Sequence, residues 1–396
     1  MILIPRPCIP SQLLPFNEAK KVLLSSFEIP ENCITVQVAD ANGLILDQPV
    51  HSKRTNPPCL LAGPDGIAVK SAETVHVSVD NQIELQAPKV NTGIPVPDGY
   101  DAVIPIEEIT VISEDRYLIY NSVAPFENTI QPGIDIVQDD LVLDTYHFIT
   151  PFDISALLSY GITEISVKNW KIGLVATGDE VISPYEDPAP GQIVDTNSYM
   201  ISAFLKKYGI TPIIYPIIKD EPENIADKLK KMSNECDMVL IFGGSSAGSK
   251  DYTVDALEQC GNLLYHGVGI VPGKPVTLAK VDEKPVIGMP GPSVASLVIL
   301  HELITPLLQK WKVPIPHCPV IQGILTEQVP SIDGFDMFLM VKVHKKGKKT
   351  FITPIPRIFG YMMGVRADAI LHKKAGTDTY IQGQVVEVRM LRDMHH

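Results

Sequence analysis

The sequence predicts a multidomain protein of the α/β plus β class, and three observations lead to this prediction. Its 396 residues suffice for two to four domains of about 150 residues each. Between about 170 and 313, short apolar runs alternate with segments of helical periodicity, which is typical of a three-layer α/β domain with a mostly parallel sheet. The chain before 168 and the chain after 314 consist instead of short β-like runs separated by turn residues. We therefore expect a central α/β domain with β-rich segments on both sides of it in the sequence.

Four strands are expected in the central domain, over 172–176, 212–218, 238–242 and 285–289. The helix after Asp195 carries apolar residues at helical spacing, and Gly209 is suited to its C-terminal stop. Pro222 is suited to the first turn of a second helix. Two further helices are predicted over 252–260 and 293–311.

The flanking segments follow a different pattern. Before 168 we expect strands over 34–38, 76–79, 102–106 and 117–120, and a helix near 151–160. After 314 we expect strands over 320–325, 338–343, 350–355, 369–372 and 385–391. About 80 residues of this kind are typical of a small β-barrel or sandwich.

Composition and charge exclude several classes of protein. The chain is 45% hydrophobic and 20% charged, as soluble globular proteins are, and 46 acidic against 33 basic residues give a net charge of −13. That balance disfavours nucleic acid and anionic membranes as partners. The longest stretch without a charged residue, 285–301, is shorter than the roughly 20 apolar residues of a membrane span, and no apolar signal-peptide core is expected near the N-terminus. The six cysteines are at least 24 positions apart, so we expect reduced thiols and a cytoplasmic location.

Candidate functional residues follow the predicted strands, because ligands of open α/β sheets bind beyond the carboxyl ends of the strands. Each of the four strand ends supplies carboxylates or a loop of small residues. These segments are Thr177-Gly178-Asp179-Glu180, Lys219-Asp220-Glu221, Gly243-Gly244-Ser245-Ser246-Ala247-Gly248-Ser249-Lys250-Asp251 and Pro290-Gly291-Pro292-Ser293.

The glycine-serine loop and the carboxylates each have two interpretations. The loop 243–248 is suited to binding an anion through backbone N–H groups, but it matches neither the Walker A nor the Rossmann pattern, and a plain strand-to-helix turn is as consistent with it. Any single acid is more simply a helix cap or first-turn residue. Several converging carboxylates would repel one another by roughly 4 kcal/mol per pair at 4 Å, which a shared Mg²⁺ would relieve. Lys274, in a Pro-Gly-Lys-Pro turn, could supply a cation, and a surface turn lysine is the simpler interpretation.

The order of these motifs resembles that of the molybdopterin molybdenumtransferases, the family of bacterial MoeA-like molybdenum-insertion enzymes and of the E domain of gephyrin. The resemblance extends over essentially the whole chain. It rests on the motifs at 177–180, 190–198, 220–223, 243–252, 272–275 and 290–291, on 65–69, 92–99 and 133–135 upstream, and on 366–371 and 375–376 downstream.

The resemblance implies a fold, a reaction and a set of partners. The central domain would be of the molybdopterin-binding type. Adenylylated molybdopterin would be hydrolysed while molybdate or tungstate is inserted into its dithiolene, with release of AMP and with Mg²⁺ as cofactor. It also implies a homodimer whose active site combines the central domain of one subunit with the N-terminal domain of the other, and contact with a molybdopterin adenylyltransferase or with enzymes that accept the cofactor.

The resemblance also assigns residues. The catalytic set is Asp65, Thr92, Asp135, Glu180, Asp220, Asp251 and Lys274, with Glu180 and Asp251 as metal ligands. The substrate-binding set is Thr177, Gly178, Asp179, Asp195, Asn197, Gly243, Gly244, Ser245, Ser246, Gly248, Pro272, Gly273, Gly291 and Ser293.

Several positions depart from the family pattern. Val271 stands where the family often has a lysine, and Leu61–Pro64 replaces a Ser-Ala-Met run. Two alternatives therefore stay open: a molybdopterin adenylyltransferase, which normally lacks the flanking β domains, and a non-catalytic molybdopterin-binding scaffold.

The expected domains are an N-terminal linker and dimerisation domain over 1–50 and 140–168, and an inserted β-rich domain over 51–139. The α/β domain is expected over 169–313 and the C-terminal β-barrel over 314–396.

Overall fold

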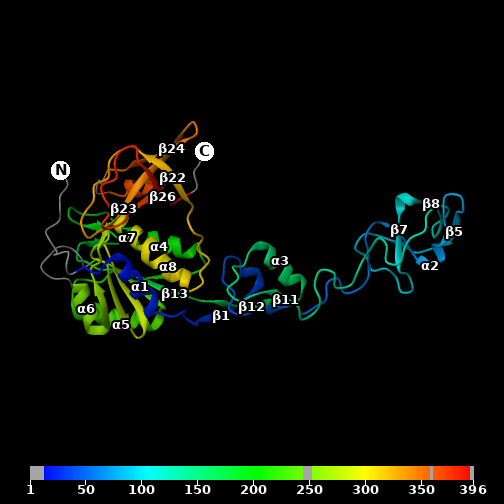
Figure 1. Cartoon of the computed structure of the whole chain (residues 1–396). Coiled ribbons are helices and arrows are strands. Elements are labelled where there is room, and N and C mark those ends of the chain that lie inside the picture. Colours follow the sequence, from blue (N-terminus) through cyan, green and yellow to red (C-terminus); the bar gives the residue numbers. More distant parts are fainter. Residues whose placement is uncertain (1–12, 244–251, 357–359, 393–396) are drawn as a thin grey trace. The chain divides into compact units, whose positions relative to one another are not determined.

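A computed structural model describes residues 13–243, 252–356 and 360–392, which form two compact units (Figure 1). The larger unit combines the residues up to Cys33 with the chain from Lys168 onward, and the smaller unit is Ile34–Val167. No helix in the described ranges has both the length and the apolar character that a membrane crossing requires.

A six-stranded sheet forms the centre of the larger unit, in the spatial order β16-β13-β17-β21-β20-β18. The first four strands are parallel, which confirms the predicted α/β sheet, and β20 runs antiparallel to both of its neighbours. The sequence analysis missed the antiparallel strands because glycines and prolines surround them. The strands are β13 (Lys171–Ala176), β16 (Thr211–Ile214), β17 (Met238–Phe242), β18 (Asn262–His266), β20 (Thr277–Val281) and β21 (Lys284–Met289).

Helices cover both faces of this sheet, as the continuous apolar runs of its central strands β17 and β21 require. The helices α5 (Pro222–Glu235) and α6 (Tyr252–Cys260) share a buried cluster with alternate residues of β17, Val239 and Ile241. Leu240, between them, is also fully buried. Figure 1 shows α4 (Asn197–Lys206) and α8 (Thr305–Lys310) on the opposite face. The predicted three-layer domain is therefore confirmed.

Two predicted elements of this domain differ in the structure. The strand expected over 212–218 ends at Ile214, because Pro216 lacks the N–H that would extend the ladder. The helix expected over 293–311 is interrupted: α7 (Ser293–Ile299) continues through a π-helical turn, η4 (Leu300–Ile304), into α8. The π-turn ends two residues before Pro306, whose nitrogen cannot donate to the carbonyl of Glu302 and whose ring would collide with that carbonyl in an α-helix.

Five strands close into a barrel near the C-terminus, which confirms the predicted C-terminal β-barrel. Their order around the ring is β23-β24-β22-β26-β25, and β25 pairs with β23 to close it. An ion pair between the partly exposed Arg389 of β26 and the buried Glu302 of η4 joins the barrel to the α/β domain. The elements of this part are β19 (Ile270–Val271), which pairs with β23, β22 (Val320–Leu325), β23 (Asp336–Lys346), β24 (Lys349–Pro354), α9 (Met362–Arg366), β25 (Ala369–Lys373) and β26 (Val385–Met390).

The smaller unit contains short strands around separate hydrophobic clusters. One cluster lies between the three-stranded sheets β6-β4-β7 and β5-β9-β8, and another packs α3 against residues near both ends of the unit. The strand predicted over 76–79 is wrong, because these residues leave α2 in turns closed by a bridge between Ser78 and Asn81. The domain boundaries within this unit stay a prediction.

The strands of this unit are β1 (Cys33–Gln37), β2 (Val50–His51), β3 (Leu61–Ala62), β4 (Gly66–Val69), β5 (Ile83–Gln86), β6 (Lys89–Val90), β7 (Ala102–Pro105), β8 (Ile109–Val111), β9 (Arg116–Ile119), β10 (Thr129–Ile130), β11 (Leu141–Leu143) and β12 (Glu164–Lys168). Its helices are η2 (Val38–Asp40), α2 (Ser71–Thr74), η3 (Ile106–Glu108) and α3 (Pro151–Ser159).

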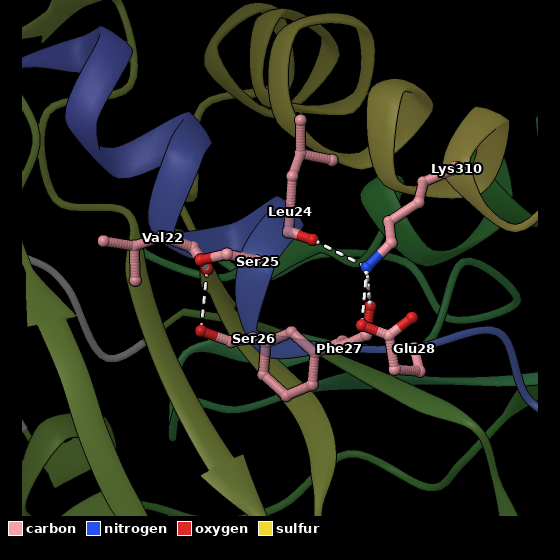
Figure 2. A network of polar contacts seen from close by, with 7 residues as sticks. All are labelled: Val22, Leu24, Ser25, Ser26, Phe27, Glu28 and Lys310. Atoms are coloured by element: carbon pink, nitrogen blue, oxygen red, sulfur yellow. Dashed lines mark hydrogen bonds and ion pairs between the residues drawn. The ribbon is translucent and has the colours of Figure 1, made fainter.

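The N-terminal helix α1 (Phe16–Ser26) belongs to the larger unit, where Lys310 at the end of α8 caps it (Figure 2). The ammonium of Lys310 donates to the carbonyls of Leu24 at 2.9 Å and Phe27 at 2.8 Å, and it pairs with Glu28 at 3.0 Å. The last turn of α1 contains no basic residue of its own. Lys310 therefore supplies the positive charge that favours a helix C-terminus.

We expect Lys310→Met to lower the free energy of unfolding of the larger unit by about 1–2 kcal/mol, because two charge-assisted hydrogen bonds to partly buried backbone carbonyls are lost. Glu28→Gln should cost about 0.5 kcal/mol or less, since the Glu28 side chain is 84% exposed. Urea titration followed by tryptophan fluorescence measures both changes, because both tryptophans of the chain, Trp170 and Trp311, are buried in this unit. Equal losses in the two variants would contradict a capping role for Lys310.

Candidate functional site

Thr177 joins the carboxyl ends of three neighbouring strands. It directly follows β13, its N–H donates to the carbonyl of Phe242 at the end of β17 at 2.8 Å, and its side chain is fully buried. Its Oγ1 donates to Oδ1 of Asp220 at 3.0 Å. The structure thus brings together two of the residues that the sequence assigned to the site, Thr177 and Asp220.

Gly243 must be glycine for this arrangement to form. Its φ is +109°, and a Cβ atom at this position would lie 2.1 Å from the carbonyl oxygen of Thr177. Backbone atoms cannot yield to such a contact, so any side chain would push the loop after β17 away from Thr177. A glycine is therefore needed at position 243 for its backbone to lie directly against the backbone of Thr177.

The carboxylate of Glu180 folds back over Gly178. A Cβ on Gly178, whose φ is +141°, would lie 2.9 Å from Oε2 of Glu180. The N–H of Gly178 donates to the carbonyl of Ile218 at 3.1 Å, and the ammonium of Lys219 donates to the carbonyl of Asp179 at 3.2 Å. In the described part of the chain, the Glu180 carboxylate has no cationic partner.

A second group of predicted residues surrounds the start of α4. Oδ1 of Asp195 accepts the N–H of Ser198 at 3.1 Å, so this carboxylate acts as a helix cap, the simpler of its two interpretations. Nδ2 of Asn197 donates to the carbonyl of Gly291 at 2.8 Å and joins α4 to the loop after β21. Oδ1 of Asn197 and Oγ of Ser198 are buried without a hydrogen-bond partner among the described atoms.

The Pro272–Lys274 turn packs against α7. A Cβ on Gly273, with φ of +124°, would lie 2.8 Å from Cδ1 of Ile299. The backbone carbonyl of Lys274 accepts the N–H of Val268 at 2.9 Å, whereas within the described ranges the ammonium of this partly buried residue makes no hydrogen bond or ion pair. Ser293 is the first residue of α7. No described hydrogen bond joins Ser293 to Pro272 or Gly273, and the assignment of these three residues to the site stays a prediction.

Part of the predicted site lies outside the described residues. This part is Gly244, Ser245, Ser246, Gly248 and Asp251. Among the residues that are described, no group of three His, Cys, Asp or Glu side chains is arranged to hold a metal ion. The predicted metal pair therefore contributes only Glu180 to the described structure.

In the smaller unit, Asp65 and Thr92 form a pair. Oδ1 of Asp65 accepts the N–H of Thr92 at 2.7 Å and its hydroxyl at 3.2 Å, and these bonds, the backbone bond first, hold the pKa of Asp65 below its usual value. The neighbouring Gly66 is required by the pairing of β4 with β7, since a Cβ there would lie 2.0 Å from the carbonyl oxygen of Ile104. Sequence reasoning assigned Asp65 and Thr92 together, and the structure brings them together.

Asp135 lies in a separate group. Its Oδ2 accepts Nδ2 of Asn56 at 2.7 Å and the hydroxyl of Tyr160 at 2.9 Å. Burial, and then the hydrogen bond to Asp135, raises the pKa of Tyr160 above its usual value. No described contact joins Asp135 to the pair of Asp65 and Thr92.

Two family descriptions match the chain. Residues 14–161 match the MoeA N-terminal region, domains I and II, and residues 173–310 match the family described as "Probable molybdopterin binding domain". The chain belongs to the MoeA family. The two matches together cover most of the smaller unit and the central sheet of the larger one, and they confirm the resemblance found in the sequence.

Relatives of this MoeA-family chain align with it over most of their length. A molybdopterin biosynthesis protein of Methanocaldococcus jannaschii is 28% identical, with 96% of this chain and 98% of the relative covered. The molybdopterin molybdenumtransferase of Haemophilus influenzae is also 28% identical, over 78% of this chain and 81% of that protein. A crystal structure of a molybdopterin biosynthesis MoeA protein from Pyrococcus horikoshii has a TM-score of 0.83 at 25% identity, and it covers 97% of this chain and 100% of its own.

Sequence reasoning missed several polar residues of these clusters, namely Asn56, Tyr160, Ser198 and Lys219. Asn56 and Tyr160 are 79 and 25 positions from Asp135, so no local pattern relates them to it. Lys219 is adjacent to Asp220 in the sequence, and Ser198 is adjacent to Asn197. This adjacency to assigned residues is the one sequence feature that indicates a role for them in the site.

We expect Thr92→Val to raise the pKa of Asp65 while leaving it below its usual value, because the substitution removes the hydroxyl bond and retains the stronger backbone bond. Since the folded-state pKa is lowered, the Asp65 contribution to stability is present above the unfolded-state pKa and is lost as pH falls through the folded-state pKa. Titration of the Asp65 carboxyl carbon by NMR measures the shift. Thr110→Val, on β8 of the same unit, serves as the control, and an unchanged Asp65 titration in Thr92→Val would contradict the assignment.

Proposed function

We propose that this MoeA-family chain inserts molybdate into adenylylated molybdopterin and releases AMP. In that reaction water hydrolyses the phosphoanhydride bond of the substrate to give AMP and the phosphorylated pterin. The two dithiolene sulfur atoms bond to the molybdenum of the oxyanion, and one oxide ligand leaves as water with the two thiol protons, so that the oxidation state of molybdenum is unchanged. The observation that supports the proposal most directly is the convergence of Thr177, Glu180 and Asp220 at the carboxyl ends of the parallel strands. Several curated relatives that align with most of the chain are named molybdopterin molybdenumtransferase, so the activity class is that of a transferase in molybdenum cofactor biosynthesis.

The described carboxylates are suited to a hard divalent cation such as Mg²⁺. Glu180 has no cationic partner in the described part of the chain, and Asp220 uses Oδ1 for its bond to Thr177. Mg²⁺ in phosphate sites is typically held by one or two carboxylates together with water and the phosphates of the substrate, so a group of three protein acids is not required. Glu180 and Asp251 are proposed as these ligands, and bound Mg²⁺ would neutralise phosphate charge.

The positive charge that the oxyanion requires is proposed to come from Lys274. With a net charge of −13, the protein as a whole repels a dianion, so the site needs a local cation. Lys274 is a partly buried residue whose ammonium makes no described ion pair, which leaves its charge available. Val271 supplies none at the neighbouring position.

One assay tests the proposed reaction against its alternatives. Purified protein is incubated with adenylylated molybdopterin, Mg²⁺ and molybdate or tungstate, and AMP is measured. We expect AMP release that depends on the oxyanion and is lost in Glu180→Gln. Binding of the substrate without AMP release would favour the scaffold, and adenylylation of free molybdopterin by ATP would favour the adenylyltransferase.

Lys274→Ala should raise the molybdate concentration for half-maximal AMP release by about 10- to 150-fold, the effect of losing one charge-assisted hydrogen bond of about 1.5–3 kcal/mol. Thermal stability should be nearly unchanged, because the ammonium makes no described contact. Lys345→Ala, an exposed residue of β23, is the matched control. Parental molybdate dependence in Lys274→Ala would identify Lys274 as a surface turn residue.

We propose in addition that the chain is a homodimer in the cytoplasm. The family-assigned residues are divided between the two units, with Asp65, Thr92 and Asp135 in one and Glu180, Asp220 and Lys274 in the other. Sedimentation equilibrium should give twice the chain mass of 43.4 kDa. A monomer that still releases AMP would exclude the dimer as a requirement. Partner enzymes that supply the substrate or accept the product stay predictions.

A further inference from the structure

Lys219 occupies a position in the candidate site that neither the motifs nor the proposed reaction explains. It stands between Ile218 and Asp220 in the segment after β16, and its side chain is exposed. Its ammonium donates to the backbone carbonyl of Asp179 at 3.2 Å, across 40 positions of the sequence. The structure gives it no ion pair with any described acid, although Asp179, Glu180 and Asp220 all belong to the segments that it joins.

The contact of Lys219 is one of three that connect the segments 177–180 and 218–220 residue by residue. Thr177 donates to Asp220, Gly178 donates to the carbonyl of Ile218, and the carbonyl of Asp179 accepts from Lys219. Thr177 and Ile218 also pair in an isolated parallel bridge. The contact of Lys219 is made to the carbonyl of Asp179, the residue directly before Glu180.

Glu180 depends on the backbone that this contact holds. Its carboxylate lies over Gly178, and its carbonyl accepts the N–H of Ile193 at 2.8 Å. Gly178 has a φ of +141°, which residues with a side chain rarely adopt. Because glycine can adopt more backbone conformations than other residues, the turn at Gly178 is free to change conformation unless a contact restricts it. A hydrogen bond on Asp179, between Gly178 and Glu180, restricts that freedom at the point where the carboxylate is placed.

We propose that Lys219 is a positioning residue for Glu180: its bond to the Asp179 carbonyl fixes the Gly178–Glu180 turn in the conformation that presents the Glu180 carboxylate to a divalent cation. The inference rests on the proposed function in that it takes Glu180 as a metal ligand. Lys219 itself touches neither the metal nor the substrate. Its charge is directed to a carbonyl, and this leaves the carboxylate of Glu180 available to the cation.

Removal of the lysine charge distinguishes positioning from simple electrostatics, because the two predict effects of opposite sign. An ammonium near several carboxylates repels a divalent cation, so if Lys219 were only a surface charge, Lys219→Met would strengthen metal binding. If Lys219 positions Glu180, the same substitution weakens metal binding in spite of the more negative site. The loss of one hydrogen bond of ordinary net strength corresponds to about three- to tenfold.

The experiment measures Mn²⁺ binding to the full-length protein without substrate, by the EPR signal of the free ion. Glu180→Gln defines the affinity that remains when the carboxylate is absent. We expect Lys219→Met to weaken Mn²⁺ binding about three- to tenfold, and Lys219→Arg, which retains a charged donor, to remain within about twofold of the parent. Lys231→Met, an exposed lysine of α5 that makes no described contact, should bind Mn²⁺ like the parent. Circular dichroism checks that each variant is folded.

Equal or tighter Mn²⁺ binding by Lys219→Met would overturn the proposal, and so would failure of Lys219→Arg to restore the parental affinity. A parent protein whose Mn²⁺ affinity is the same as that of Glu180→Gln would overturn it as well. None of these outcomes measures AMP release, so the transferase activity stands or falls by its own assay.

Discussion

The hydrogen bonds of Thr177 hold together the ends of three parallel strands, and the candidate site depends on them. A parallel sheet aligns its carboxyl ends at one edge but does not by itself determine how the following loops approach one another. Here a buried threonine binds one loop through its N–H and another through its hydroxyl. Gly243 makes the first approach possible by lacking a side chain, and Asp220 gives the second a charged acceptor. Among the described residues, the Asp220 carboxylate is therefore held by a neutral hydroxyl group and not by pairing with a cation.

The two described lysines near the candidate site differ in their polar partners. A chain of net charge −13 contains few cations near the carboxyl edge, and the two described there have different surroundings. Lys219 is bound to a carbonyl, whereas Lys274 has no described polar partner. Under the two proposals made above, the lysines would have separate tasks, Lys219 ordering a loop and Lys274 binding the oxyanion.

Much of the fold could be predicted from the sequence, and the parts that could not share a physical cause. Strands with continuous apolar runs, such as 238–242, and helices with regular spacing were predicted almost to the residue. The hairpin of β18 and β20 was missed because its strands lie among glycines and prolines that usually mark loops. Within the site, Asp65, Thr92 and Asp135 were each assigned through family motifs. The contact between Asp65 and Thr92 and the partners of Asp135 join residues that are distant in sequence, so only the folded chain reveals them. The capping role of Asp195 was also open, since a helix cap and a ligand-binding acid occupy the same kind of position.

The course of the chain between α1 and β13 has a consequence for how such a protein can change. The chain leaves the larger unit after Cys33 and returns at Lys168, and between these points it forms the whole of the smaller unit. The points of departure and return are neighbours: the N–H of Asn169 donates to the carbonyl of Asn32 at 3.0 Å, and β1 pairs with β12. An insertion whose two ends are adjacent imposes little strain on its host. The segment 34–167 is thus an inserted module, which recombination could exchange or remove as one piece and replace with a short turn. Such a change would leave the contact between Lys310 and α1, and the core of the central sheet, in place.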